Sequence, residues 1–206
     1  MKAADRQIWL EKYVEGFMFN DIDACIKGRA NFAAALVLSA YTEILGGLTN
    51  GTLTERKASG SNYRVFLARM GYSPEECSAY YDSVRCGLVH QYFIKGNQIN
   101  IGMSTPVLGT KGLRDAFGVI SFIIESYVAE FKKAYFTYKA ELLLGEGLLP
   151  ANFDKALGDE TVPVAARADA SIHSLGASTI STDVTILVPE FGPMPPRPKE
   201  EHGSAL

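Results

Sequence analysis

The sequence predicts an all-α fold: a bundle of about five helices, with a small β-hairpin and an irregular C-terminal extension added to it. Apolar residues recur with 3–4 spacing through most of the first 145 residues. Ser73, Pro74 and Glu76 together form a complete helix-start signal. The composition is 47% hydrophobic, which is enough for a sizeable core. We therefore expect a helical domain over residues 1–147 and an extension over residues 148–206.

Three helices are expected before residue 71. The first covers residues 4–26, where apolar positions alternate with charges. The second covers residues 30–45 and is apolar nearly all round, which predicts the central helix of the core. The pair Gly46-Gly47 is expected to end it. A short third helix covers residues 62–70.

The fourth helix begins at Ser73 and runs to about His90. Its apolar stripe predicts the buried face: Cys77, Tyr80, Tyr81, Val84 and Leu88. A hairpin signal follows over residues 92–101, with Lys95-Gly96-Asn97 at its turn. Residues 111–144 are expected to form a long fifth helix. Beyond it, we expect a weak helix, a single strand at residues 179–188 and a proline-rich end.

The bulk composition excludes several classes of protein. The net charge is −3, which argues against a broad basic face for duplex nucleic acid. Cys25, Cys77 and Cys86 are widely spaced and odd in number, which indicates free thiols in a reducing compartment. The longest apolar runs, residues 32–38 and 119–124, are far too short to cross a membrane. We expect a soluble, cytoplasmic protein with no membrane partner.

The most informative residues for function are Arg85 and His90, at the C-terminal end of the fourth helix. Arginine supplies a permanent cation with a planar fork of donors, and histidine exchanges protons near neutral pH. Glu43 is the one charged residue between Arg29 and Glu55, and a buried carboxylate needs a partner. Arg85 is a candidate for that partner, and the pair would hold the guanidinium in place.

Residues five apart on an ideal helix differ by about 140°, so Arg85 and His90 do not share one face. They can converge if the helix loosens at Gly87, or if two copies of the helix pack across a twofold axis. Cys86 and Gly87 are small and would let a second backbone approach on the side of His90. Tyr92 aligns with Arg85 if the turn continues.

Simpler roles are also open for these residues. His90 could cap the helix C-terminus, and Arg85 could form a structural salt bridge with Glu43 or Asp82. Cys86 is more often a small core residue than a nucleophile. The scattered histidines and cysteines lack metal-ligand spacing, and the chain has no glycine-rich phosphate loop, so neither a metal nor a cofactor is expected.

The pattern Arg85-x4-His90-x-Tyr92 resembles the signature of the HEPN superfamily (higher eukaryotes and prokaryotes nucleotide-binding). It is similar to the form in HEPN toxins that are paired with minimal nucleotidyltransferase antitoxins. The helical order over residues 5–145 fits as well. The resemblance implies an HEPN-like bundle and a homodimer in which the two motifs face each other.

The resemblance also implies a function: a metal-independent endoribonuclease that acts on RNA, as a toxin or stress effector. His90 would transfer protons and Arg85 would neutralise phosphoryl charge. Glu43, Cys86 and Tyr92 would assist, and Tyr92 corresponds to the tyrosine that a nucleotidyltransferase antitoxin modifies. Active members commonly have a polar residue where this chain has Cys86. The alternatives are a non-catalytic HEPN-like module that binds a nucleotide or a protein partner, and a purely structural helical dimer.

Overall fold

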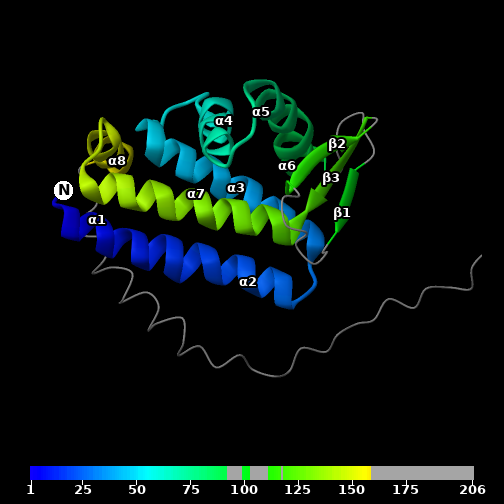
Figure 1. Ribbon diagram of the computed structural model, residues 1–206, viewed down its shortest axis with the longest axis horizontal. Coiled ribbons are helices and arrows are strands. Elements are labelled where there is room, and N and C mark those ends of the chain that lie inside the picture. The colour runs from blue at the N-terminus through cyan, green and yellow to red at the C-terminus, as the bar shows by residue number, and fades with distance from the viewer. Residues whose placement is uncertain (92–98, 103–110, 117, 159–206) are drawn as a thin grey trace, which may run out of the picture. The chain divides into compact units, whose positions relative to one another are not determined.

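The computed structural model describes residues 1–91, 99–102, 111–116 and 118–158. The chain divides into two units, Met1–Val162 and Pro163–Leu206, and all described residues belong to the first. That unit is mostly helical, with a small three-stranded sheet (Figure 1). The predicted mainly helical fold class is confirmed at this level.

The first predicted helix is present as one continuous helical run. It consists of α1 (Ala3–Trp9), a π-helical stretch η1 (Leu10–Met18) and α2 (Phe19–Lys27). Its buried face follows a spacing of four, since the wider π turn brings every fourth or fifth residue to the same side: Leu10, Val14, Met18 and Ile22. This run packs against α3 (Asn31–Asn50) (Figure 1).

The prediction that Gly46-Gly47 ends the second helix is wrong. α3 continues to Asn50 and ends at Gly51, whose φ of 71° is left-handed. The glycine pair lies instead where α3 meets α4 (Ser59–Arg69): a Cβ on Gly46 would be 1.7 Å from the carbonyl oxygen of Asn62. The glycines therefore allow two helix backbones to approach closely, and a helix stop is not their role.

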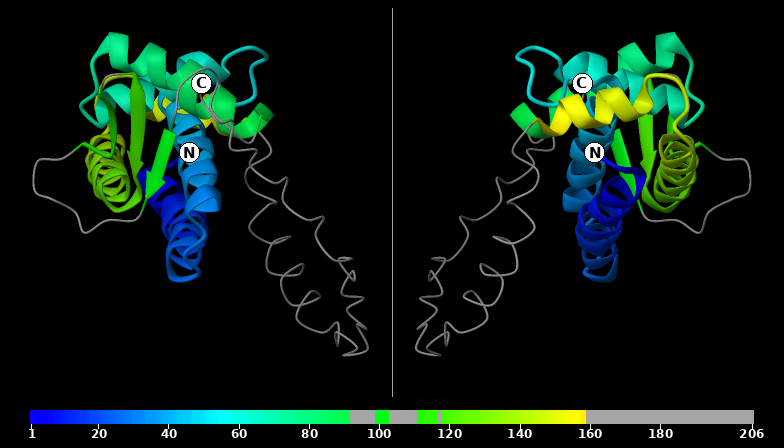
Figure 2. Two further views of the ribbon diagram at one scale, coloured as in Figure 1. Left: turned by 90° about the vertical axis from the view of Figure 1, so that its right-hand side faces the viewer. Right: turned by 90° about the vertical axis from the view of Figure 1, so that its left-hand side faces the viewer.

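α3 is also the one described helix that is long and apolar enough to cross a membrane by length and composition. The search for uninterrupted apolar runs did not find this helix, because Ser39, Thr42 and Glu43 interrupt its apolar residues. In the structure 56% of the helix's apolar window is buried within the chain. α3 packs against α2, α4, α7 (Ile124–Leu144) and α8 (Leu149–Leu157), as the central helix of a helical core does (Figure 2).

The prediction of one helix over residues 111–144 is wrong in its first third. The structure has β2 (Leu113–Ala116) and β3 (Val119–Ile123) there, and the helix, α7, begins at Ile124. β3 is central: it pairs antiparallel with β2 and parallel with β1 (Ile99–Gly102). The burial of β3 alternates residue by residue, which is the period of a strand. The first strand and the turn of the predicted hairpin fall within residues 92–98, which lie outside the described residues.

The beginning of the C-terminal extension packs on the helical domain. α8 is bound there by Asn152, whose Nδ2 donates to the carbonyl oxygen of Thr49 at 2.9 Å. Asp154 accepts from Arg6 Nε at 3.0 Å and from Arg6 Nη2 at 2.8 Å. The predicted strand at residues 179–188 lies outside the described residues.

Candidate functional site

The helix that carries the Arg85–His90 motif begins as the sequence predicts. The backbone N–H of Glu76 donates to Ser73 Oγ at 3.3 Å, and the Ser73 N–H donates to Glu76 Oε2 at 2.7 Å. The helical run then continues through α5 (Pro74–Tyr80), a π turn η2 (Tyr81–Arg85) and α6 (Cys86–Gln91). Four residues of the predicted stripe are buried: Cys77, Tyr80, Val84 and Leu88. The fifth, Tyr81, is half-buried. The capping box is thus confirmed.

Glu43 and Arg85 form the ion pair that the sequence suggested. Arg85 Nε donates to Glu43 Oε2 at 2.6 Å, and the two side chains are 19% and 20% exposed. The alternative partner, Asp82, is exposed to solvent. This is the single hydrogen bond of the guanidinium to the described residues, to which Nη1 and Nη2 donate none.

The backbone between Arg85 and His90 is regular α-helix. The π turn lies just before it, where the N–H of Cys86 donates to the carbonyl oxygen of Tyr81. Gly87 does not loosen the helix, so one of the two expected routes by which the motif residues converge is not used. On an ideal α-helix, the backbone positions of residues 85 and 90 would be about 140° apart around the axis.

The small residues of the motif are placed differently from each other. Gly87 is buried within its own chain, so it offers no open surface to a second backbone, contrary to the expectation. Cys86 is half-buried, and Val89 is 43% exposed. The side chain of His90 and the whole of Tyr92 lie outside the described part of the structure.

A polar cluster that sequence reasoning missed fixes the N-terminal end of the motif helix. Tyr72 OH donates to Glu130 Oε2 at 2.6 Å and accepts from the Leu113 N–H at 2.8 Å. The Gly112 N–H donates to the same carboxylate oxygen at 3.1 Å. Burial raises the pKa of Glu130, while the bonds from Tyr72 and Gly112 oppose that rise. Burial and the Glu130 carboxylate also raise the pKa of Tyr72.

Lys111 extends this cluster to the helix itself. Its Nζ donates to both carboxylate oxygens of Glu76, at 2.9 and 2.7 Å, and this bond lowers the pKa of Glu76. The same ammonium lies 4.8 Å from the ring centre of Tyr72. These contacts were not expected, because residues 111–113 were predicted to belong to a helix.

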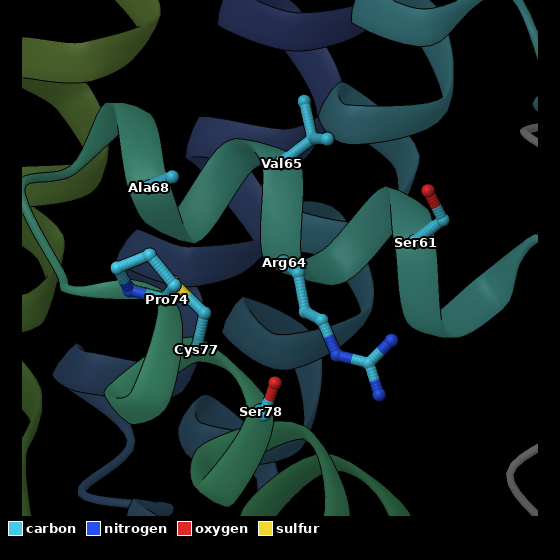
Figure 3. Close-up of a pocket in the computed structure, with 7 residues that line it drawn as sticks. All are labelled: Ser61, Arg64, Val65, Ala68, Pro74, Cys77 and Ser78. Atoms are coloured by element: carbon cyan, nitrogen blue, oxygen red, sulfur yellow. The ribbon is translucent and has the colours of Figure 1, made fainter.

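A second site lies between α4 and α5, on the same helical run. Seven residues line a surface pocket of about 320 Å³ (Figure 3): Ser61, Arg64, Val65, Ala68, Pro74, Cys77 and Ser78. The Arg64 side chain runs along the pocket on the side of Ser78 (Figure 3). Sequence reasoning did not single out Arg64, because one arginine on a short helix carries no signal by itself.

Among the described residues, no group of three histidine, cysteine or acidic side chains could hold a metal ion. Comparison with models of protein families, with curated proteins and with solved structures gives no match. The function is therefore inferred from the geometry of the chain itself.

Proposed function

We propose that this chain is an HEPN-like, metal-independent endoribonuclease whose active site is shared by two copies. The observation that supports it best is the ion pair between Glu43 and Arg85. It ties the arginine of the motif to the acidic residue on the preceding apolar helix, and the other two guanidinium nitrogens have no hydrogen bond to the described residues. An arginine held in this way is suited to an anionic ligand such as a phosphodiester.

In the proposed reaction, the ribose 2′-oxygen attacks the adjacent phosphorus and the bond from phosphorus to the 5′-oxygen breaks. The products are a 2′,3′-cyclic phosphate and a free 5′-hydroxyl. His90 takes the proton from the 2′-hydroxyl or delivers one to the 5′-oxygen. Arg85 neutralises the charge that builds up on the phosphoryl oxygens.

The regular helix between residues 85 and 90 favours a site built from two copies. On one straight helix the two positions diverge by about 140°, whereas a twofold axis can bring Arg85 of one copy near His90 of the other. The half-exposed Val89 and half-buried Cys86 leave apolar surface on this part of the helix for such a contact.

The first experiment is cleavage of a single-stranded RNA in the presence of EDTA. Wild-type protein is expected to cut and to leave a cyclic phosphate, and His90→Ala is expected to lose this activity. Asp82→Ala is the control, since Asp82 is an exposed residue on the same helical run and is not the partner of Arg85, so this variant should stay active. Cutting that persists in His90→Ala, or that stops in EDTA, contradicts the proposal.

A mixing experiment tests the shared site directly. Arg85→Ala and His90→Ala, each inactive alone, are denatured, mixed in equal amounts and refolded. Random reassociation makes half of the dimers mixed. If one site combines Arg85 and His90 from different copies, each mixed dimer has one intact site of its two. The mixture should regain about a quarter of wild-type activity. No recovery would place both residues of a site on one chain.

Two observations favour a second candidate function, a non-catalytic HEPN-like module that binds a nucleotide or a protein. Cys86 stands where active members of the superfamily commonly have a polar residue, and the net charge of −3 does not favour RNA. This module would bind an anion at Arg85 without cutting RNA. Binding of a short RNA that is lost in Arg85→Gln, with no cleavage at any protein concentration, would favour it.

The resemblance also proposes a setting for the enzyme: a cytoplasmic toxin or stress effector with a nucleotidyltransferase antitoxin. Transfer of a nucleotide to Tyr92 would add negative charge beside the motif and repel RNA. Incubation with such a nucleotidyltransferase and a nucleoside triphosphate should raise the mass of the wild type and leave Tyr92→Phe unchanged.

A further inference from the structure

Arg64 differs from the other arginine of the same helix in having no acidic partner among the residues that the structure describes. Its Nε is buried and has no hydrogen-bond partner within the described residues. Arg69, five residues further along α4, donates from Nη1 to Glu141 Oε2 at 2.7 Å. Because a buried charged donor without a partner costs free energy, the Arg64 guanidinium has a reason to attract a ligand.

The guanidinium of Arg64 is also held in position before any ligand arrives. Its central carbon lies 5.0 Å from the ring centre of Tyr81, in a cation–π contact. The Tyr81 ring is fixed in turn, because its hydroxyl is hydrogen-bonded to Ser59 Oγ at 3.2 Å. A fixed guanidinium loses less conformational freedom when it binds an anion.

The pocket beside Arg64 has two chemical parts. Its apolar part is formed by Val65, Ala68 and Pro74, with the buried Cys77 thiol. Its polar part is Arg64 with two hydroxyls, those of Ser61 and Ser78 (Figure 3). None of the seven lining residues is acidic. The Arg64 charge acts on this space, since it opposes the rise that burial causes in the pKa of Cys77.

We propose that this pocket binds a small organic phosphate monoester. The planar fork of a guanidinium matches two phosphate oxygens, and the serine hydroxyls can donate to a third. A carboxylate has two oxygens and would use fewer of these donors. The apolar part of the pocket would cover the organic body of the ligand. The site is distinct from the Arg85–His90 motif and does not depend on the function proposed for it.

Phenyl phosphate is the probe for this proposal, titrated into the full ¹⁵N-labelled chain while amide shifts are recorded. Saturable shifts are expected at Ser61 and Ser78. Inorganic phosphate and benzoate are titrated separately, and both should bind more weakly. Arg64→Gln should weaken phenyl phosphate binding at least about tenfold, which is 1.4 kcal/mol. Arg69→Gln removes a charge from the same helix and should leave binding unchanged.

Several outcomes would overturn the proposal: no saturable shifts with phenyl phosphate, equal weakening by the two arginine substitutions, or benzoate binding as tightly as phenyl phosphate. If Arg64→Gln does not fold, Ala68→Phe provides the second test. Ala68 is exposed at the pocket, so the larger ring fills the apolar part without disturbing the core. It should abolish binding, and unchanged binding would exclude this pocket.

Discussion

Replacing Gly46 by alanine tests the contact that fixes α3 against α4. A Cβ on Gly46 would lie 1.7 Å from the carbonyl oxygen of Asn62 and 2.5 Å from its carbonyl carbon. Both atoms belong to the backbone, so no rotamer change can relieve the clash. Because carbon atoms pack at about 3.5–4.0 Å, the two helices would have to separate by roughly 1.5–2 Å at this point.

Two opposing effects set the size of the loss. Alanine favours a helix over glycine by about 1 kcal/mol. Overpacking of a well-packed core costs about 1–3 kcal/mol, occasionally more, and a clash between two backbones belongs at the upper end or beyond it. We expect a net loss of about 2 kcal/mol in the free energy of unfolding. At about 2–4 °C per kcal/mol for a domain of this size, Tm should fall by about 4–8 °C.

Urea denaturation and thermal melting, both followed by circular dichroism, measure this loss. Gly16→Ala is the matched control: it lies in a helix, and its Cβ would meet one neighbour, the Glu11 carbonyl oxygen, at 3.3 Å. It should change stability by less than about 1 kcal/mol. If Gly46→Ala is as stable as wild type or as Gly16→Ala, the helices do not approach as described, and the argument from close packing fails.

Three further predictions concern polar contacts, each measured by urea denaturation. Glu43→Gln and Arg85→Gln in a double-mutant cycle should give a coupling energy of about 1–3 kcal/mol, and strict additivity would contradict a direct pair. Ser73→Ala removes the N-cap and should cost about 1 kcal/mol, whereas no change would show that the cap contributes nothing. Burial raises the pKa of Glu130 above its ordinary 4.5, so the folded state keeps a proton that the unfolded state releases. This contribution to stability is present below pH 4.5 and is lost as pH rises through the folded pKa. Glu130→Gln, which still offers Tyr72 an acceptor, should remove this pH dependence; parallel pH profiles of the two proteins would refute it.

Local signals in the sequence were sufficient for some elements. The start of the motif helix could be predicted because Ser73, Pro74 and Glu76 act on their own backbone within one turn. The partner of Glu43 could be suggested because a carboxylate in an apolar helix needs a cation, and Arg85 was one candidate. Both inferences depend on the chemistry of a few residues, and the structure bears them out.

Contacts between distant segments decided the elements that sequence reasoning missed. Leu113 and Ile120 fit a helical spacing as well as a strand, and the sequence offered no means of choosing. The structure places Gly112 against Tyr127, where a Cβ would lie 2.4 Å from the Tyr127 Cα. Gly46-Gly47 was ambiguous for the same reason, since glycine both ends helices and lets them approach each other.

Charged residues on solvent-facing helices were the hardest to interpret. Glu130 is one of several charged residues on α7, and nothing in its neighbours predicts that Tyr72 and Gly112 bind it. Arg64 and Arg69 lie on one short helix and look equivalent in the sequence. They differ because Glu141, 72 residues from Arg69 in the chain, forms an ion pair with Arg69 and not with Arg64.

The anchoring of the motif helix bears on how Arg85 and His90 could act together. Its beginning is fixed by the capping box and by the bond from Lys111 to Glu76, and its middle by the bond from Arg85 to Glu43. A helix held at both points has little freedom to rotate one motif residue toward the other. If Arg85 and His90 act on one phosphate, the simplest arrangement takes one of the two residues from a second copy of the chain. A protein that cuts RNA as a strict monomer would contradict this inference. Light scattering at the protein concentrations used for cleavage measures the molar mass and so distinguishes an active dimer from an active monomer.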